Sequence, residues 1–544
     1  MKPRFNPHSP AWIRALLSLD WPIAVLLASF GLLGAAVVAY ATTWGPVIYS
    51  DAAGYIKISE NILAGHGVGV FEPSGRFSPL THQPPFYPII LAGVQLSGLN
   101  GVDAARWLHV VLFGLTVSLT GGLLYCFSRS LWLAAAGCLL VLASPVLLPV
   151  FPTAMSEPAF TFIALAGLAL FLAYFDRERT GFLVGAGFLM GLALLTRYLG
   201  AALILAGGLS LLLFAAGSLW RRVGRAAIFG LAGALPAVVW LTGVYLAKIE
   251  LPRRLQESQS YIFRAREALA ALVNTLWNWF PGLENVLVDA NRPRTLLLAL
   301  CAAGLLAFAV LALHRLGPAG LQAGRWLGVL ALFFFTLPAT LIVMYTFSDP
   351  APDVDDRMLS PSYPWFVLLL LGLGWLLCRA WKPRWLLALP AALAAAFLLF
   401  FAPRNLALLD ELHQKGKGYL SVQTRSSPTL RAAQGLPAGT ILISNENALL
   451  LFYTGRPVYP MAEAVKFEPQ ELDLRYGDYL ADASEQLFRQ QGAALVLFDS
   501  VRWQLDPLYG PQAEARWQAL VRGLTVYADD EDGAIYFYPT EENP

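Results

Sequence analysis

Four ionisable residues stand beside long apolar runs of this sequence: Asp51, Glu157, Arg197 and Arg357. An ionisable side chain at membrane depth is costly, which makes each of them a candidate functional residue. A carboxylate in that setting can act as a general base on a hydroxyl group. A guanidinium group can bind a phosphate through two parallel hydrogen bonds. These residue types can therefore remove a proton from a hydroxyl group and bind an anionic group.

Asp51 begins a segment whose apolar positions Tyr55, Ile58, Ile62 and Leu63 have helical spacing. This pattern predicts a short amphipathic helix lying on the membrane. Asp51 would stand at its N-terminus, where the helix dipole favours a carboxylate. The alternative for Asp51 is a plain helix cap. Tyr55, on the same helix, is a candidate substrate contact.

The remaining candidates also have structural interpretations. Glu157 suits the N-terminus of a helix, Arg197 can snorkel at a helix end, and Arg357 can pair with acidic residues of its own loop. His82 and Lys248 are further candidate substrate contacts, for which a solvated loop side chain is the alternative.

One acidic group, Asp353, Asp355 and Asp356, has the oxygen ligands that a hard cation prefers. The spacing lacks the rest of a calcium loop, and no Cys/His spacing indicates zinc. We therefore expect no cofactor and no resident metal, with a divalent cation at this acidic group as the open alternative.

The elements that position these residues belong in a membrane. Hydrophobic residues make up 57% of the 544 residues and charged residues only 14%, whereas a soluble domain has roughly 25% charged residues. The net charge of +2 and the lack of basic tracts exclude a nucleic-acid partner. We expect a polytopic α-helical membrane protein.

Apolar runs of bilayer length predict about eleven spans, which are 21–42, 104–127, 131–151, 157–175, 181–196, 199–217, 226–247, 294–313, 326–347, 363–378 and 384–402. The shorter run Pro84–Leu96 predicts a partial or re-entrant helix. With the N-terminus in the cytoplasm, every short inner loop carries Lys or Arg. Asp51, Glu157, Arg197 and Arg357 then all face the outer side.

Two domains follow from this count. Residues 1–402 would form the transmembrane domain, with 43–83 as its first outer loop, and 403–544 a periplasmic or extracellular α/β domain. Buried strands are predicted at 440–444 and 494–498, and a hairpin around the acidic turn 529–533. The long loop 248–293 carries Trp277 and Trp279, which look like interfacial anchors.

The order of several short motifs resembles the GT-C membrane glycosyltransferases, and most of all the bacterial protein O-mannosyltransferase and aminoarabinose transferase family. The motifs are Asp51 after the first span, His82–Pro88, Met155–Phe160, Leu195–Tyr198 and Asp356–Pro364, with Met358 where the family usually has tyrosine. The resemblance covers roughly 20–400.

The resemblance implies a hexosyl- or pentosyltransferase of a bacterial inner membrane. Its donor would be a polyprenyl-phosphate sugar, and its acceptor a lipid, glycan or protein on the periplasmic face. Asp51 would be the catalytic base and Glu157 would orient substrate, while Arg197 and Arg357 would bind the donor phosphate. The alternatives are a transporter or flippase of lipid-linked saccharides, which would need polar groups at mid-span, and a non-catalytic membrane sensor.

Overall fold

The computed structural model describes residues 21–73, 75–81, 83–247, 261–282, 291–348, 351–381, 389–460, 487–488, 491–501 and 510–539. The chain divides into two compact units. The helical unit comprises Met1–Thr43 and Thr81–His413, and the mixed unit comprises Trp44–Leu80 and Gln414–Pro544. Most of the segment predicted as the first outer loop therefore belongs to the same unit as the C-terminal part of the chain. The change of unit falls at 413/414, whereas the sequence predicts it at 402/403.

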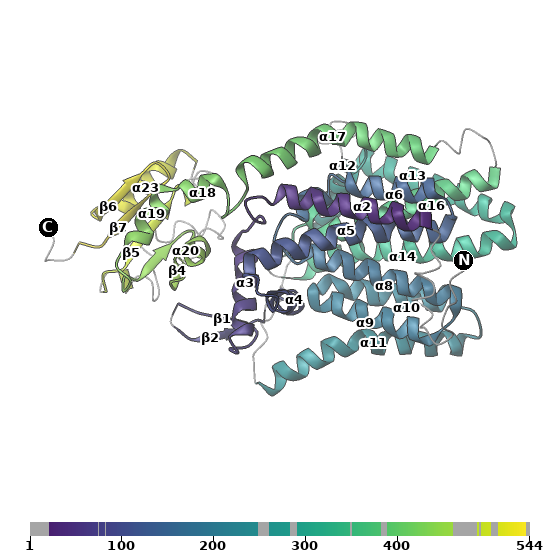
Figure 1. The fold of residues 1–544 in the computed structure, drawn as a ribbon, viewed down its shortest axis with the longest axis horizontal. Helices are drawn as coiled ribbons and strands as arrows, with labels where there is room; N and C mark the ends of the chain where they lie inside the picture. Colours follow the sequence, from purple (N-terminus) through teal and green to yellow (C-terminus); the bar gives the residue numbers. More distant parts are fainter. Residues whose placement is uncertain are drawn as a thin grey trace. The chain divides into compact units, whose positions relative to one another are not determined.

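Helices that run side by side build the helical unit (Figure 1). They are α2 (Trp21–Ala41), α4 (Phe86–Gln95), α5 (Gly101–Ser128), α6 (Leu131–Leu142), α7 (Leu147–Val150), α8 (Glu157–Arg177), α9 (Thr180–Thr196), η1 (Tyr198–Gly200), α10 (Ala201–Phe214), α11 (Leu219–Leu246), α12 (Tyr261–Asn278), α13 (Asn291–Leu316), α14 (Pro318–Phe347), α15 (Asp356–Leu359), η2 (Ser360–Ser362), α16 (Tyr363–Trp381) and α17 (Leu389–Lys415).

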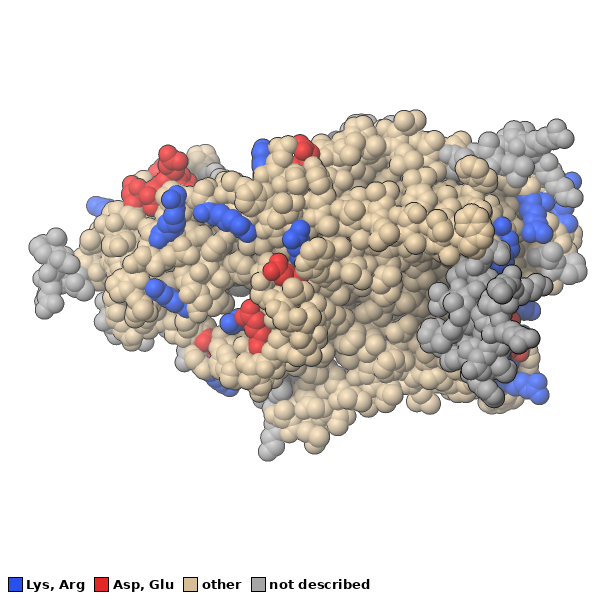
Figure 2. Space-filling view, viewed as in Figure 1, with Lys and Arg blue, Asp and Glu red and all other residues tan. Residues whose placement is uncertain are grey.

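Seven of the described helices are long and apolar enough to cross a membrane, namely α2, α5, α8, α11, α13, α14 and α16. On the face shown in Figure 2, the described charged side chains gather toward the ends of the helical unit and leave a broad uncharged band between them. The chain is a multi-pass membrane protein. The other four predicted spans lie on α6, α9, α10 and α17, which do not meet that criterion, so the count of eleven stays a prediction.

The predicted span 131–151 is not one helix. It divides into α6 and the single turn α7, with a break at Ala143–Val146. Pro145 has no backbone N–H to continue the helical ladder, and the Ser144 hydroxyl accepts hydrogen bonds from the backbone N–H groups of Val146 and Leu147 at 3.2 and 3.0 Å. The run 84–96 forms the ten-residue helix α4, which is too short to cross a bilayer.

Glycines allow α9 and α11 to approach closely. A Cβ atom at Gly187 would meet the carbonyl oxygen of Phe229, and one at Gly191 would meet the carbonyl oxygen of Gly233 and the ring of Pro236. Small residues four apart are a common device for packing helix backbones in membranes. This contact fixes the end of α9, directly before Arg197.

The loop predicted at 248–293 contains the helix α12. Trp277 and Trp279 are each only 1% exposed, so the interpretation of these two residues as interfacial anchors is wrong. The Trp279 indole donates a hydrogen bond to the Asp356 carboxylate at 2.8 Å, and its ring packs edge-on against Tyr363. Arg264 of α12 donates to the carbonyl oxygens of Tyr345 and Ser348 at the end of α14.

The mixed unit is built on a five-stranded sheet of order β4-β3-β5-β7-β6. Its elements are α3 (Ser50–Leu63), β1 (Gly69–Phe71), β2 (Phe77–Pro79), α18 (Val422–Ser426), α19 (Pro428–Gly435), β3 (Leu442–Ser444), α20 (Asn447–Thr454), β4 (Val458–Pro460), β5 (Ala494–Phe498), η6 (Gly510–Gln512), α23 (Ala513–Val521), β6 (Thr525–Asp530) and β7 (Gly533–Phe537).

Both predicted buried strands and the predicted hairpin are present in this sheet. β3 pairs in parallel with β4 and β5, while β7 pairs antiparallel with β5 and β6. β6 is the last described strand on its side, and its residues are largely exposed. Ile443, Leu495 and Leu497 are fully buried and form the core together with Trp517 of α23.

Candidate functional site

Glu157 is the first residue of α8, and its side chain is fully buried. Pro158 in the first helical turn suits a helix start, because no backbone donor is needed there. A carboxylate at this end of a helix is stabilised by the helix dipole. Even so, a buried carboxylate is expensive without a cationic partner, and the partners of Glu157 come from two distant parts of the chain.

Arg197 is the first of these partners. It ends α9 in an extended conformation and leads into the 3-10 turn η1. Its Nη1 lies 2.8 Å from Oε1 of Glu157 and donates a hydrogen bond to the hydroxyl of Ser156 at 3.0 Å. Its Nη2 donates to the sulfur of Met358. The side chain turns inward and is 14% exposed, so the snorkelling alternative is wrong.

Arg357 is the second partner and comes from the short helix α15. Asp355 caps this helix, because its side chain accepts a hydrogen bond from the backbone N–H of Met358 at 2.9 Å. The Nη1 of Arg357 lies 3.5 Å from Oε1 of Glu157, and its Nη2 lies 3.8 Å from Oδ2 of Asp353. With 38% of its side chain exposed, Arg357 is the more accessible of the two arginines.

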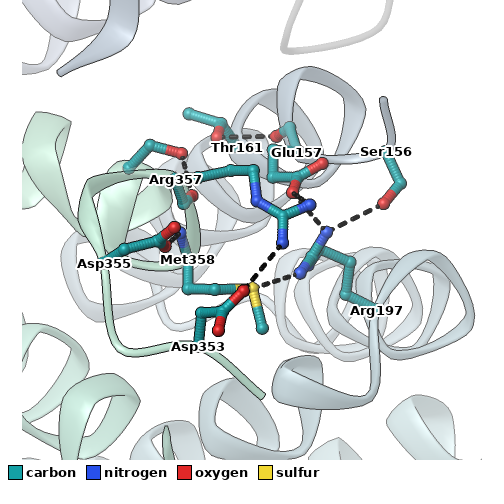
Figure 3. A network of polar contacts seen from close by, with 9 residues as sticks. Ser156, Glu157, Thr161, Arg197, Asp353, Asp355, Arg357 and Met358 are labelled. Carbon is teal, nitrogen blue, oxygen red and sulfur yellow. Dashed lines mark hydrogen bonds and ion pairs between the residues drawn. The ribbon is translucent and has the colours of Figure 1, made fainter. Parts of the chain in front are cut away.

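Figure 3 shows both guanidinium groups directed at the same carboxylate. Asp353 is the other acidic side chain in ion-pair contact, and it is 76% exposed, so solvent screens its charge. The two guanidinium groups around the buried Glu157 carboxylate thus leave positive charge that, of the residues described, only the solvent-exposed Asp353 offsets. This described cluster of Glu157, Arg197 and Arg357 suits a further anion such as a phosphate.

The second carboxylate oxygen of Glu157 is unusual. Within the described residues neither oxygen has a hydrogen bond of regular geometry, and both ion pairs reach Oε1 rather than Oε2. Nearly all buried polar atoms in proteins have a partner, so such an atom requires an explanation. A hydroxyl group of a bound molecule would supply the missing donor.

Two of the acidic residues in this loop, Asp355 and Asp356, make hydrogen bonds that stabilise the fold. Asp355 caps α15, and Asp356 accepts the hydrogen bond of Trp279. In the part of the chain that the structure describes, no group of three His, Cys, Asp or Glu residues has a geometry that could hold a metal ion.

Asp51 lies in the mixed unit, in the first turn of α3, and its side chain is exposed. The N-cap residue of α3 is Tyr49, and no side chain caps the helix by a hydrogen bond, so Asp51 is not a capping residue. Tyr55 of the same helix is buried. His82 and Lys248 lie outside the described residues.

Sequence reasoning missed Tyr419, whose hydroxyl is within electrostatic reach of the carboxylates of both Asp51 and Glu446. Burial raises the pKa of Tyr419 above its ordinary value, and the carboxylates of Glu446 and Asp51 raise it further. Tyr419 therefore stays a neutral hydrogen-bond donor. The signal for Glu446 was its position just after a predicted strand, because ligands of open α/β sheets bind beyond the carboxyl ends of the strands.

The fold is that of the GT-C membrane glycosyltransferases, which confirms the family resemblance of the sequence at the level of fold. The crystal structure of ArnT from Cupriavidus metallidurans bound to undecaprenyl phosphate matches with a TM-score of 0.53 and 17% identity, over 96% of this chain and 99% of that chain. ArnT in the apo state also matches with a TM-score of 0.53 and 17% identity, over 94% and 97% of the two chains.

A third similar structure is the archaeal oligosaccharyltransferase AglB from Archaeoglobus fulgidus, in complex with an inhibitory peptide and a dolichol-phosphate. It matches with a TM-score of 0.50 and 12% identity, over 96% of this chain and 75% of that chain. No family model and no curated protein sequence matches the chain.

Proposed function

We propose that this chain transfers a sugar from a polyprenyl-phosphate carrier to an acceptor on the periplasmic face of a bacterial inner membrane. The observation that carries the proposal is the pair of guanidinium groups held on one buried carboxylate, which leaves positive charge available for a phosphate. The fold supports it, because the similar ArnT structure is bound to undecaprenyl phosphate and the similar AglB structure is in complex with a dolichol-phosphate.

The proposed reaction is a single displacement at the anomeric carbon of the donor sugar. The acceptor oxygen forms a bond to that carbon while the bond between the carbon and the phosphate oxygen breaks. The proton of the acceptor hydroxyl passes to Asp51, and the electron pair of the broken bond leaves with the lipid phosphate. The anomeric configuration is inverted.

The other residues have separate roles in this proposal. Arg357, the accessible arginine, donates hydrogen bonds to the phosphate as its negative charge grows. Arg197 is held by Ser156 and Glu157 and adds a fixed positive charge. The unpartnered Oε2 of Glu157 accepts a hydrogen bond from a hydroxyl of the donor sugar and so orients it. The type of sugar, hexose or pentose, and the acceptor stay open.

The test is sugar transfer by the purified full-length chain in nanodiscs, with a panel of undecaprenyl-phosphate sugars. The donor is chosen from the envelope lipids that change in a deletion strain, measured by mass spectrometry. We expect Asp51→Asn to reduce turnover by about 100-fold to 10,000-fold, the usual contribution of a general base. Glu60→Gln is the matched control, since Glu60 is an exposed carboxylate on the same helix, paired with Lys57 at 3.1 Å.

Turnover of Asp51→Asn equal to that of the wild type would remove Asp51 as the base. Movement of intact donor lipid between leaflets, with no new glycosidic bond, would replace the transferase with a flippase.

A further inference from the structure

A cavity of about 550 Å³ opens at the far end of the helical unit from Glu157. α8 begins at Glu157 and ends at Arg177, a residue that lines this cavity. The 21 residues of α8 span roughly 30 Å at 1.5 Å per residue, about the thickness of a bilayer core. The cavity is therefore a site separate from the cluster around Glu157.

Arginines from the ends of three helices line the cavity: Arg129 after α5, Arg177 at the end of α8 and Arg379 near the end of α16. Asp176 is the acidic residue in the lining. Among the described residues, none of the three guanidinium groups has a carboxylate within ion-pair distance, although ion pairs occur elsewhere in the unit. Figure 2 shows basic side chains gathered at an end of the helical unit.

Aromatic rings hold the arginines and form one wall. The guanidinium carbon of Arg379 lies 5.0 Å from the ring centroid of Trp375, a cation–π distance that leaves the N–H donors available. Phe127 stacks on Trp326 with a centroid distance of 4.6 Å and contacts Trp375 at 5.0 Å. The cavity thus combines positioned cations with a rigid apolar surface.

A second cavity of about 330 Å³ adjoins the first and shares Asp176, Gln322 and Trp326 with it. Its other lining residues are mostly apolar, namely Leu172, Phe175, Leu321 and Val329, together with Arg325. A cationic chamber beside an apolar one matches a molecule with an anionic head and a hydrocarbon tail. A soluble anion would gain nothing from the second chamber.

We propose that the two cavities form a binding site for an anionic phospholipid. The lipid phosphate lies among Arg129, Arg177 and Arg379, and the first segment of an acyl chain lies against Leu172 and Val329. Basic pockets at the membrane-facing ends of transmembrane helices recognise such head groups. By the distribution of Lys and Arg in the loops, this lipid comes from the cytoplasmic leaflet.

The first experiment measures lipid retention by native mass spectrometry of the full-length chain, titrated with phosphatidylglycerol or with zwitterionic phosphatidylcholine. We expect phosphatidylglycerol to be preferred, and Arg177→Gln/Arg379→Gln to weaken its binding at least about tenfold, because charge-assisted hydrogen bonds are lost. The control Arg179→Gln/Arg221→Gln removes the same charge from two exposed arginines outside both cavities and should bind like the wild type.

Equal loss in the two double variants would overturn the proposal, because any basic surface would then suffice. Inorganic phosphate as competitor separates the two sources of a phosphate group. Displacement of phosphatidylglycerol by millimolar phosphate would show an anion site without a lipid tail and would also overturn it.

The second experiment keeps every arginine, so it does not depend on the folding of charge variants. A photo-crosslinking amino acid replaces Gln322, which lines both cavities. In nanodiscs of mixed composition we expect it to capture phosphatidylglycerol in excess over its mole fraction. Capture in proportion to the bulk lipid would count against the site.

Discussion

Glu157 positions both Arg197 and Arg357, because each guanidinium group contacts the same oxygen of its carboxylate. When one partner of a buried ion pair is removed, the charge of the other partner is left uncompensated. The free energy of unfolding then typically falls by several kcal/mol. The two arginines are nevertheless unequal: Arg197 is nearly enclosed and hydrogen-bonded to Ser156, whereas Arg357 keeps a large exposed surface. Arg357 is thus the side chain with donors to offer to a ligand.

The variant Arg357→Lys tests whether the accessible Arg357 binds the phosphate of a ligand. Lysine keeps the charge but loses the planar pair of donors, so binding of a lipid phosphate should weaken by about tenfold while acceptor binding stays unchanged. The measurement is KM for donor and acceptor separately in the nanodisc transfer assay. Arg266→Lys on α12 is the control, since Arg266 is exposed. An unchanged donor KM in Arg357→Lys would argue against its phosphate role.

Tyr419 provides a pH-dependent prediction in the mixed unit. Its pKa is raised by burial and by the carboxylates of Glu446 and Asp51 from an ordinary value of 10.0. The unfolded chain therefore releases this proton before the folded chain does. The free energy of unfolding should fall as pH rises above about 10 and should be insensitive to this residue below that value.

Tyr419→Phe should flatten this dependence, while Tyr527→Phe, which alters an exposed tyrosine of β6, should not. The measurement is the thermal unfolding temperature of each full-length variant between about pH 8 and about pH 11. If the unfolding temperatures of the wild type and of Tyr419→Phe depended on pH in the same way, the assignment of this pH dependence to Tyr419 would be wrong.

At the scale of elements, the close contact of α9 with α11 positions Arg197. Gly191→Ala would place a Cβ atom against the carbonyl oxygen of Gly233 and the ring of Pro236. We expect a loss of about 1–3 kcal/mol of stability, as for other overpacked cores. Sugar transfer should fall as well, because the end of α9 shifts.

Gly208→Ala on α10 is the matched control, since nothing lies within 4 Å of the added Cβ atom. It should be neutral or slightly stabilising, because alanine favours a helix over glycine. Thermal unfolding in detergent measures both variants. A Gly191→Ala protein as stable as the control would mean that the two helices separate easily.

The elements also show how far the sequence can predict this fold. Apolar runs of bilayer length predict helices, and alternation around 529–533 predicts a hairpin, because both signals are local. The helix α12 lies in the run that the sequence predicts as the long loop 248–293, and its Arg264 donates hydrogen bonds to carbonyl oxygens at the end of α14. The break between α6 and α7 follows from Pro145, a residue inside an apolar run whose length alone predicts one continuous span.

The sequence predicts the individual residues of the candidate site but not the contacts between them. Motif order pointed to Glu157, Arg197 and Arg357, which the structure brings together. Their common contact could not be read from the sequence, because it depends on helices 40 and 200 residues apart packing at one end. Asp51 was expected on a membrane-lying helix. The apolar face of α3, including Tyr55 and Ile58, is instead buried within the protein.

At the scale of the molecule, the distribution of basic loops predicts which ends face the cytoplasm. In a variant whose four cysteines are replaced by alanine, Tyr527→Cys should react with a membrane-impermeant maleimide in intact spheroplasts. Ser218→Cys, before α11, should react only after lysis. Both positions are exposed in the structure. Labelling of both from the same side would contradict the predicted orientation.

β6, the outermost described strand of the sheet, has one further consequence. A strand with an unpaired side offers backbone donors and acceptors to any other chain, and neighbouring copies can then aggregate through it. The end of β6 and the turn after it carry Asp529, Asp530 and Glu531. Two copies that paired in parallel along this strand would bring these like charges together. The acidic turn that marks the hairpin in the sequence therefore also disfavours the parallel stacking of copies along this strand.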